Sequence, residues 1–598
     1  MNVSPADAPR PPWCRLIAAA GLVLLAAIPH AVAQDAGEAA APISLFPPTV
    51  GGESPAAGAS PPEAAEFSDI EIDRLGELPL DSLGILDVAN GGLGAEAWAG
   101  SRRATVERLL DDLPVDVVSP TLRRLAARLL LTSAIAPGRS TGAAPTVADA
   151  LADADSADFL RRRAERLYDL GELAGLNRLL ALVPQRAEDP WLARLRVDGL
   201  LLAGRDDEAC GQVGDGLARF PQELYWTKVQ VYCQFSSGQT DQALLGLDLL
   251  REQAPDGEAA FFAAANLFIG GTADGLGGDD LSPLTLAMLR KAGGGLPAGA
   301  VETAPPPLLH GIAGLGGGDH VAQAAAVERL VELGALPGER LAGAYGAFEF
   351  TEADLADALG EAEPAGGVRA RALLYRAANR EGLAATRAEI LRAAFLSAER
   401  DGRATAMARA ALPLMGELPP TPELAWFAPL AARTLYRAGQ YERAGAWLSV
   451  LRSDGQRDPE SQEAYVRLRP LMRLAGGPEP LAADADILEN PQATERALLY
   501  FVLSRALGQA EDFALLDAAE TGGAQPLERL PRLLALGDAA AAQRRGETVL
   551  LTLASLGSAT PHDSHPLALG YAVSALNAVG LGTDARALAI EAALAAGL

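Results

Sequence analysis

The chain has 598 residues, with 50 Lys and Arg against 77 Asp and Glu, which gives a formal net charge of −27. Such an acidic chain repels phosphate backbones and anionic bilayers, so nucleic acid and anionic membrane surfaces are excluded as expected partners. Hydrophobic residues make up 49% of the sequence, and the length exceeds that of one compact domain unless the chain is a repeat array.

The start of the chain, residues 1–33, has the pattern of a secretory signal peptide. Arg10 and Arg15 precede the apolar run of residues 16–28, and Ala31-Val32-Ala33 has the small residues of a cleavage site. The competing interpretation is a membrane anchor, but the run is shorter than the roughly 20 residues that a spanning helix needs. We therefore expect cleavage after Ala33 and a mature protein that is periplasmic or secreted, without stable membrane insertion.

Residues 34–75 are rich in Pro, Gly, Ala and acidic side chains. A segment of this composition buries too little apolar surface to offset the conformational entropy lost on folding. It is predicted to be a disordered tether. Beyond it, Ser101 and Ser119-Pro120 are typical capping signals and predict the first two helices.

A helix-turn-helix pattern recurs from about residue 157. Gly171, Gly204 and Gly238 each follow a predicted first helix, at nearly equal intervals along the chain. These intervals match the period of roughly 34 residues that is typical of tetratricopeptide-type solenoids, which stack antiparallel helix pairs. We therefore predict an all-α fold, with a first helical array over residues 76–270.

Glycine-rich turns dominate residues 271–320, where Ser282-Pro283 predicts the start of one short helix. We interpret this region as a break, followed by a second array over residues 321–598. The clearest unit of that array is residues 422–454, with an aromatic early in the first helix, Gly439 at the turn, and then Tyr-x-x-Ala. This arrangement closely resembles a tetratricopeptide repeat, which implies a helical solenoid that presents a binding surface.

A second resemblance lies nearer the N-terminus, in residues 81–110 and 119–134. These segments resemble an alphaproteobacterial family of exported helical proteins of unknown function, some of which carry the name antifreeze glycopeptide polyprotein. Antifreeze glycopeptides are strings of Ala-Ala-Thr units, whereas the alanines here lie within charged, amphipathic helix patterns. The resemblance therefore implies an exported helical protein and gives no support to ice binding.

Cys210 and Cys233 are the two cysteines that follow the predicted cleavage point. Cys210 precedes Pro221 by the same sequence distance by which Cys233 follows Gln222, and Pro221-Gln222 is the turn between their helices. Residues equidistant from the turn of an antiparallel helix pair lie level with each other, as a disulfide requires. An oxidising compartment favours the bond. The alternative is two buried free thiols that pack as small hydrophobic side chains.

The sequence offers little sign of catalysis or metal binding. No histidine is followed by glutamate, which excludes the zincin motif, and neither Lys228 nor Lys291 follows a glycine as the Walker A motif requires. His562-Asp563-Ser564-His565 carries metal-ligating groups, but flanking prolines favour a solvated loop. We therefore expect a non-enzymatic protein without a cofactor or a metal.

A binding groove has five candidate residues, which are aromatic or basic and lie in first helices of the predicted pairs: Trp426, Arg433, Arg437, Tyr225 and Trp226. At helical spacing, aromatic side chains belong more often to the core between helices than to a ligand surface. The alternative for the aromatic residues is therefore a place in the core between helices.

Together these features predict a protein-binding scaffold or adaptor of the cell envelope, with a protein or peptide as its partner. One alternative is a helical subunit associated with a peptidoglycan-processing enzyme, since soluble lytic transglycosylases also contain superhelical α-domains. Those enzymes end in a lysozyme-like domain, whereas the last residues here are expected to continue the helical pattern. A third interpretation is a self-assembling structural protein.

Overall fold

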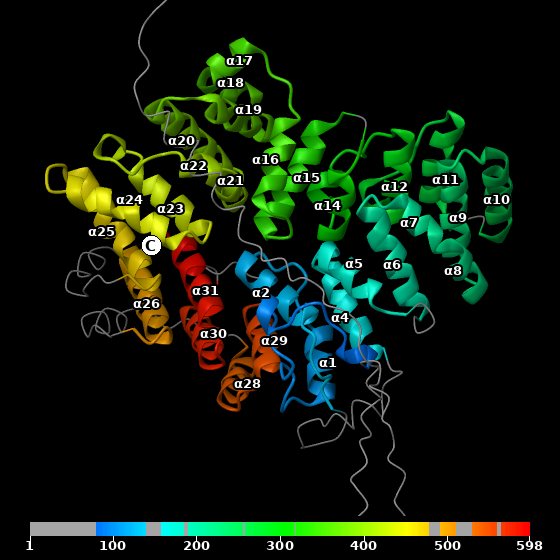
Figure 1. Cartoon of the computed structure of the whole chain (residues 1–598), viewed down its shortest axis with the longest axis horizontal. Coiled ribbons are helices and arrows are strands. Elements are labelled where there is room, and N and C mark those ends of the chain that lie inside the picture. The colour runs from blue at the N-terminus through cyan, green and yellow to red at the C-terminus, as the bar shows by residue number, and fades with distance from the viewer. Residues whose placement is uncertain are drawn as a thin grey trace, which may run out of the picture. The chain divides into compact units, whose positions relative to one another are not determined.

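The computed structural model describes residues 79–138, 157–184, 189–254, 257–316, 318–477, 491–509, 529–558 and 564–598. The predicted signal peptide and tether lie outside these ranges. Within them the structure is all-helical, and the β-structure is one isolated bridge between Leu86 and Thr132. The prediction of an all-α fold is therefore confirmed for the described part of the chain (Figure 1).

The helices of the first half, with short 3-10 turns between some of them, are α1 (Arg103–Asp111), α2 (Pro120–Leu131), α4 (Asp158–Asp169), α5 (Leu173–Ala181), α6 (Pro190–Leu202), α7 (Asp206–Gly211), α8 (Val213–Arg219), α9 (Leu224–Ser236), α10 (Thr240–Gln253), α11 (Ala259–Asn266), α12 (Pro283–Ala292), α13 (Ala300–Thr303) and α14 (Pro306–Ala313). Those of the second half are α15 (His320–Leu333), α16 (Gly338–Gly346), α17 (Glu352–Ala356), α18 (Ala358–Ala365), α19 (Gly367–Arg380), α20 (Ala384–Arg400), α21 (Ala404–Ala410), α22 (Leu412–Gly416), α23 (Ala428–Arg437), α24 (Tyr441–Asp454), α25 (Pro459–Leu474), α26 (Pro491–Ala506), α28 (Leu530–Ala541), α29 (Arg545–Leu556), α30 (Pro566–Ala578) and α31 (Gly582–Ala595).

One of the two predicted capping serines is confirmed. The Ser119 hydroxyl accepts a hydrogen bond from the Leu122 N–H at 3.2 Å, and Pro120 is the first residue of α2. The prediction for Ser101 is wrong, because α1 begins at Arg103 and its N-cap residue, Arg102, makes no side-chain capping bond.

The same tight turn joins the helices of several hairpins. In each hairpin, a residue in the turn that follows the first helix adopts a left-handed conformation. These residues are Gly171, Gly204, Gly238, Gly439, Gly580 and Gln543. In each case its N–H donates to the carbonyl three residues back, and the next N–H donates to the carbonyl five residues back. These are the paired bonds of a Schellman turn, which satisfy the last carbonyls of the helix. The three regularly spaced glycines of the first array therefore end α4, α6 and α9 as predicted.

Gly171 and Gly204 allow a matched test of this turn, since both have a φ of 72°. Gly204→Ala is expected to cost about 1 kcal/mol for the left-handed backbone alone, because no atom lies within 4 Å of an added Cβ. Gly171→Ala should cost more, since its Cβ would lie 2.8 Å from Cβ of Pro306 in α14. Urea denaturation of both variants measures the difference, and equal losses would contradict the contact.

The region 271–320 is packed against its neighbours, and the expectation of a break with one short helix needs correction. The start signal itself is confirmed, since the Ser282 hydroxyl caps α12 by accepting from the Thr285 N–H at 3.1 Å. However, α13 and α14 follow it. Arg290 of α12 pairs with Asp206 of α7 at 2.6 Å. The glycines end helices here without interrupting the packing, which sequence composition alone does not reveal.

His310 of α14 gives the stability a pH dependence. Its Nε2 lies 2.8 Å from the Gly171 carbonyl oxygen, and burial lowers the pKa of His310 to about 4. The unfolded chain, with a histidine pKa near 6.5, therefore binds the extra proton first. The contribution of neutral His310 to the free energy of unfolding should be complete above pH 6.5. It should then decrease as the pH falls towards about 4, by at most about 1.4 kcal/mol per pH unit. Denaturation midpoints of the wild type and His310→Gln over this range isolate the contribution; a constant difference would refute it.

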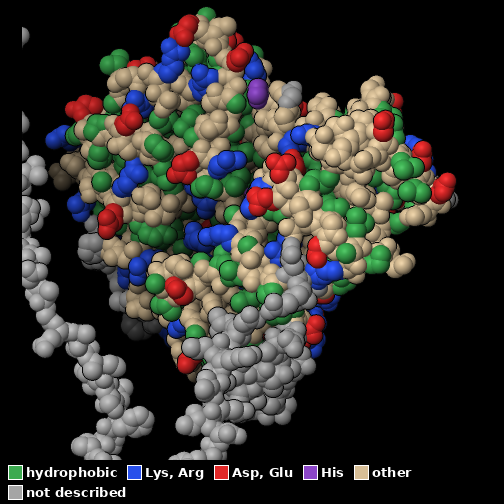
Figure 2. Space-filling view, turned by 45° about the vertical axis from the view of Figure 1, so that its right-hand side comes forward, with side chains coloured by type: hydrophobic (Ala, Val, Ile, Leu, Met, Phe, Trp, Pro, Cys, Tyr) green, Lys and Arg blue, Asp and Glu red, His purple; other side chains and the backbone are tan. Residues whose placement is uncertain are grey.

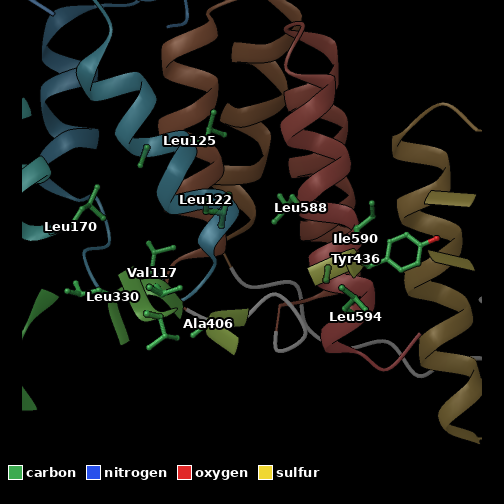
Figure 3. Packing of buried hydrophobic residues seen from close by; sticks show 14 of the residues in the cluster. Val117, Leu122, Leu125, Leu170, Leu330, Ala406, Tyr436, Leu588, Ile590 and Leu594 are labelled. Carbon is green, nitrogen blue, oxygen red and sulfur yellow. The ribbon is translucent and has the colours of Figure 1, made fainter. Parts of the chain in front are cut away.

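The buried side chains form two clusters. The larger one runs through helices from both ends of the chain, and Figure 3 shows Leu122 and Leu125 of α2 in the same cluster as Leu588 of α31 and Leu330 of α15. The smaller cluster is built by α6 to α12 and contains Trp226, which is 1% exposed. Helices α6 to α12 thus have a core largely of their own.

The N-terminal helices pack on the C-terminal ones, with α1 and α2 beside α29 and α31 (Figure 1). Arg128 of α2 donates to both carboxylate oxygens of Asp584 in α31, at 2.8 Å each. The Gly546 N–H donates to the Ala97 carbonyl at 2.8 Å. The two ends of the described helical array therefore cap each other, since each supplies apolar surface and hydrogen-bond partners to the other.

Candidate functional site

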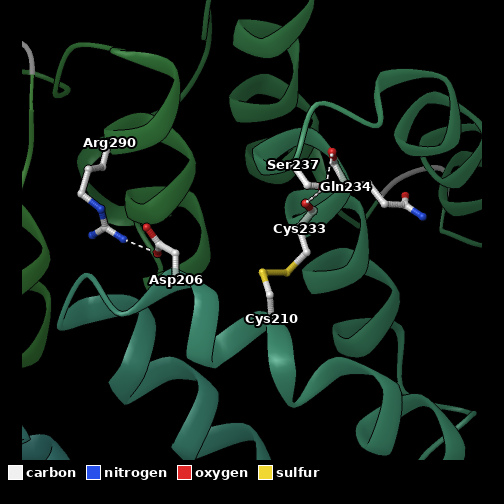
Figure 4. The surroundings of a disulfide bond; sticks show 6 residues. All are labelled: Asp206, Cys210, Cys233, Gln234, Ser237 and Arg290. Atoms are coloured by element: carbon white, nitrogen blue, oxygen red, sulfur yellow. Dashed lines mark hydrogen bonds and ion pairs between the residues drawn. A yellow bond between two sulfur atoms is a disulfide. The ribbon is translucent and has the colours of Figure 1, made fainter.

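The two cysteines form the predicted disulfide. Cys210 lies in α7 and Cys233 in α9, with Cα atoms 5.7 Å apart (Figure 4). The helix pair is less regular than expected, because the first helix divides at Gln212 into α7 and α8. The bond still links the two sides of the hairpin in the smaller core cluster, and its role is structural because it leaves no free thiol there.

Tyr225 and Trp226 lie in that same cluster, at 7% and 1% exposure. The Tyr225 hydroxyl donates to the Asp198 carboxylate at 2.7 Å, and the Arg194 guanidinium lies over its ring, 4.6 Å from the centroid. Burial raises the pKa of Asp198 to about 6. These two aromatic residues therefore hold helices together and do not line an open groove.

Trp426, Arg433 and Arg437 are placed differently. Trp426 lies just before α23 and is 46% exposed. A spacing of four residues puts Arg433 and Arg437 on the same side of α23. Arg437 pairs with Glu399 of α20 at 3.1 Å, whereas Arg433 makes no hydrogen bond or ion pair within the described residues.

Further arginines lie near this side of α23. Burial lowers the pKa of the Arg433 guanidinium, and the positive charges of Arg437, Arg496 and Arg467 lower it further against the opposing effect of Glu399. We call Trp426, Arg433, Arg437, Arg467 and Arg496 the α23 arginine face. Acidic, basic and apolar side chains intermingle over the side of the molecule shown in Figure 2. Arg433 therefore lies near three other arginines in an acidic protein, and of these Arg437 pairs with Glu399 and Arg467 with Glu463.

A cavity of ≈ 440 Å³ lies beside this face, and we call it the central pocket. Five separate parts of the chain line it, from α2, α15, α21, the α23–α24 hairpin and α31: Val118, Pro120, Thr121, Arg124, Glu332, Gly402, Ala404, Thr405, Arg409, Tyr436, Arg437, Ala438, Gly439, Tyr441, Ala587, Ile590, Glu591, Leu594 and Ala595. Sequence reasoning found Arg437 among these residues but missed the others. Nothing in their local patterns indicates that α2 and α31 meet.

The two carboxylates of the central pocket accept hydrogen bonds from backbone N–H groups. Glu332 accepts from the Ala406 N–H at 2.7 Å and the Thr405 N–H at 3.3 Å, at the start of α21. Glu591 accepts from the Thr121 N–H at 3.2 Å, at the start of α2. Burial raises the pKa of the Glu591 carboxyl, which these hydrogen bonds oppose. Both side chains thus serve mainly to complete helix ends.

The guanidinium groups of the central pocket have fewer hydrogen-bond partners for their donors than the two carboxylates have for their oxygens. Arg409 donates to the Val331 carbonyl at 2.7 Å, and its pKa is lowered by burial and then by the charge of Arg124. Arg124 itself is exposed and makes no hydrogen bond or ion pair within the described part of the chain.

A second, smaller cavity of ≈ 300 Å³ is lined in part by α17 and α19. It differs from the central pocket in that its Arg380 and Glu352 pair with each other at 2.7 Å.

The described residues include few side chains that are arranged for catalysis or for metal binding. Among the described residues no three His, Cys, Asp or Glu side chains are grouped to hold a metal ion. His565 caps α30 by accepting from the Leu567 N–H at 3.1 Å, whereas His562 and Asp563 lie outside the described residues. The sequence has one match to the Gly-x-Ser-x-Gly pattern, at Gly138 to Gly142, but residues 133–138 form no strand to begin a nucleophile elbow.

Comparisons with known proteins found no protein-family model, no curated protein and no solved structure that matches this chain. Of the helices that the structure describes, none combines the length and apolar composition needed to cross a membrane.

Proposed function

We propose that this protein is a non-enzymatic, exported helical-repeat scaffold that binds an acidic surface of another envelope protein through the α23 arginine face. The supporting observation is the charge pattern of that face. Arg433 lacks a partner within the described residues and is repelled by three neighbouring arginines, in a chain of net charge −27. Arginines pair well with carboxylates, so an acidic partner would offset this repulsion.

Two further features support the proposal. The hairpins share one turn geometry and recur at a nearly constant interval over α4 to α10, as in tetratricopeptide-like arrays that bind proteins. The leader of residues 1–33 has the pattern of an export signal. An exported array of helix hairpins would serve as a binding surface for another protein.

The test is crosslinking of the tagged full-length protein in cells, followed by mass spectrometry of the proteins that co-purify from the envelope. We expect one dominant partner that is lost in the variant Arg433→Gln/Arg496→Gln. The fold should be retained, because neither arginine makes an ion pair or hydrogen bond with another described residue. Arg108→Gln is the matched control, since Arg108 is exposed on α1, away from this face.

Retention of the same partner in the double variant would overturn the proposed face. Crosslinks of the protein only to itself would instead favour the self-assembling structural protein. A partner with activity on peptidoglycan would identify the scaffold as the helical subunit of such an enzyme.

A further inference from the structure

The lining of the central pocket combines apolar and basic side chains. Its apolar members include Val118, which is 45% exposed, together with Ile590 and Leu594 of α31. Its basic members are Arg124, Arg409 and Arg437. The volume of ≈ 440 Å³ falls in the range of small-molecule sites in proteins. The pocket therefore combines apolar contact surface with guanidinium donors in a space suited to a small ligand or a chain end.

We propose that the central pocket binds a ligand in which an apolar group ends in a carboxylate, with Arg124 as the principal contact of that carboxylate. This inference goes beyond the binding of a partner at the α23 arginine face and does not depend on it.

Arg124 is assigned this role because its guanidinium is the least satisfied of the three. Arg437 has Glu399, and Arg409 has the Val331 carbonyl, whereas Arg124 has no partner within the described residues. A guanidinium presents paired N–H donors whose geometry matches a carboxylate. Tyr441, on which the charges of both Arg124 and Glu591 act, lies on the same lining and offers a hydroxyl donor.

The acidic side chains of the pocket do not exclude an anionic ligand. Glu332 and Glu591 are directed to backbone N–H groups at the starts of α21 and α2. The positive end of a helix offsets a carboxylate held there. Their negative charges are thus largely compensated before a ligand arrives, while the positive charge of Arg124 is not.

Two kinds of molecule offer this chemistry: a peptide C-terminus with an apolar last residue, and a free fatty acid. The test uses the purified protein and fluorescence polarisation of a labelled peptide ending in Ala-Ala-Leu, as the free acid and as the amide, with octanoate as a competitor. We expect the free acid to bind and the amide to bind at least about tenfold more weakly, because the charge-assisted bond is lost. Arg124→Gln should weaken free-acid binding by a similar factor.

Two controls locate the site. Arg108→Gln should leave binding unchanged, and Ala595→Phe should block the pocket without changing its charge, since Ala595 is an exposed residue of the lining. Thermal melting of each variant checks that the fold is retained. If neither peptide binds, titration calorimetry measures octanoate directly, and its binding supports the site and assigns it to free acids. Equal binding of acid and amide, no binding of any probe, or full binding by Arg124→Gln would overturn the inference.

Discussion

Arg371→Met is expected to lower the free energy of unfolding by about 3–5 kcal/mol, the typical cost of removing one partner from a buried ion pair. Arg371 of α19 and Glu328 of α15 are 3% and 1% exposed, and Nη2 lies 2.6 Å from Oε2. The Tyr345 hydroxyl donates to Oε1 of the same carboxylate at 2.6 Å. Without the guanidinium, a buried carboxylate is left with one phenol donor, since water cannot replace the lost bonds.

Chemical denaturation of the purified protein measures this loss, and α19 supplies its own control. Arg380 lies on the same helix and pairs with Glu352 at 2.7 Å, but its side chain is 50% exposed. Arg380→Met should therefore leave the unfolding midpoint unchanged within error. Adding Glu328→Gln to Arg371→Met should restore part of the stability, because the remaining group is then neutral. Similar losses in the two single variants would show that burial of the pair does not matter.

Loss of the Cys210–Cys233 disulfide is expected to cost about 3 kcal/mol, since the bond closes a loop with a sequence separation of 23 residues. The effect should be concentrated in helices α6 to α12, whose smaller core cluster contains both bonded helices. Cross-linking restricts the unfolded chain, so its loss favours local unfolding of this part.

Hydrogen exchange of Cys210→Ser/Cys233→Ser against the wild type measures where protection is lost. We expect amides of α9 and α10 to exchange faster, while those of α29 and α31 keep their protection. The wild type treated with a reductant should behave as the variant does. Labelling of both thiols in native, unreduced protein would show that the bond is absent and remove the basis of the prediction.

The local features of the fold could be predicted from the sequence because each depends on neighbouring residues. Gly171, Gly204 and Gly238 mark turns, since a left-handed residue after a helix favours glycine. Ser119-Pro120 begins α2 for a similarly local reason. The cysteine pair could be predicted because an antiparallel hairpin fixes which residues lie level. Of the candidate groove, Arg433 and Arg437 lie on the α23 arginine face, whereas Tyr225 and Trp226 are buried.

Only the tertiary structure decided the features that join distant parts of the chain. Glycine content suggested a break at residues 271–320, but α12 and α14 pack there on earlier helices. No periodicity shows that Thr121 meets Glu591, or that five segments enclose a pocket. The sequence by itself determined helices, turns and the disulfide because backbone propensity and short-range geometry act over a few residues. Closure of the array and the central pocket were decided by which apolar faces pack together, a choice that depends on the whole chain.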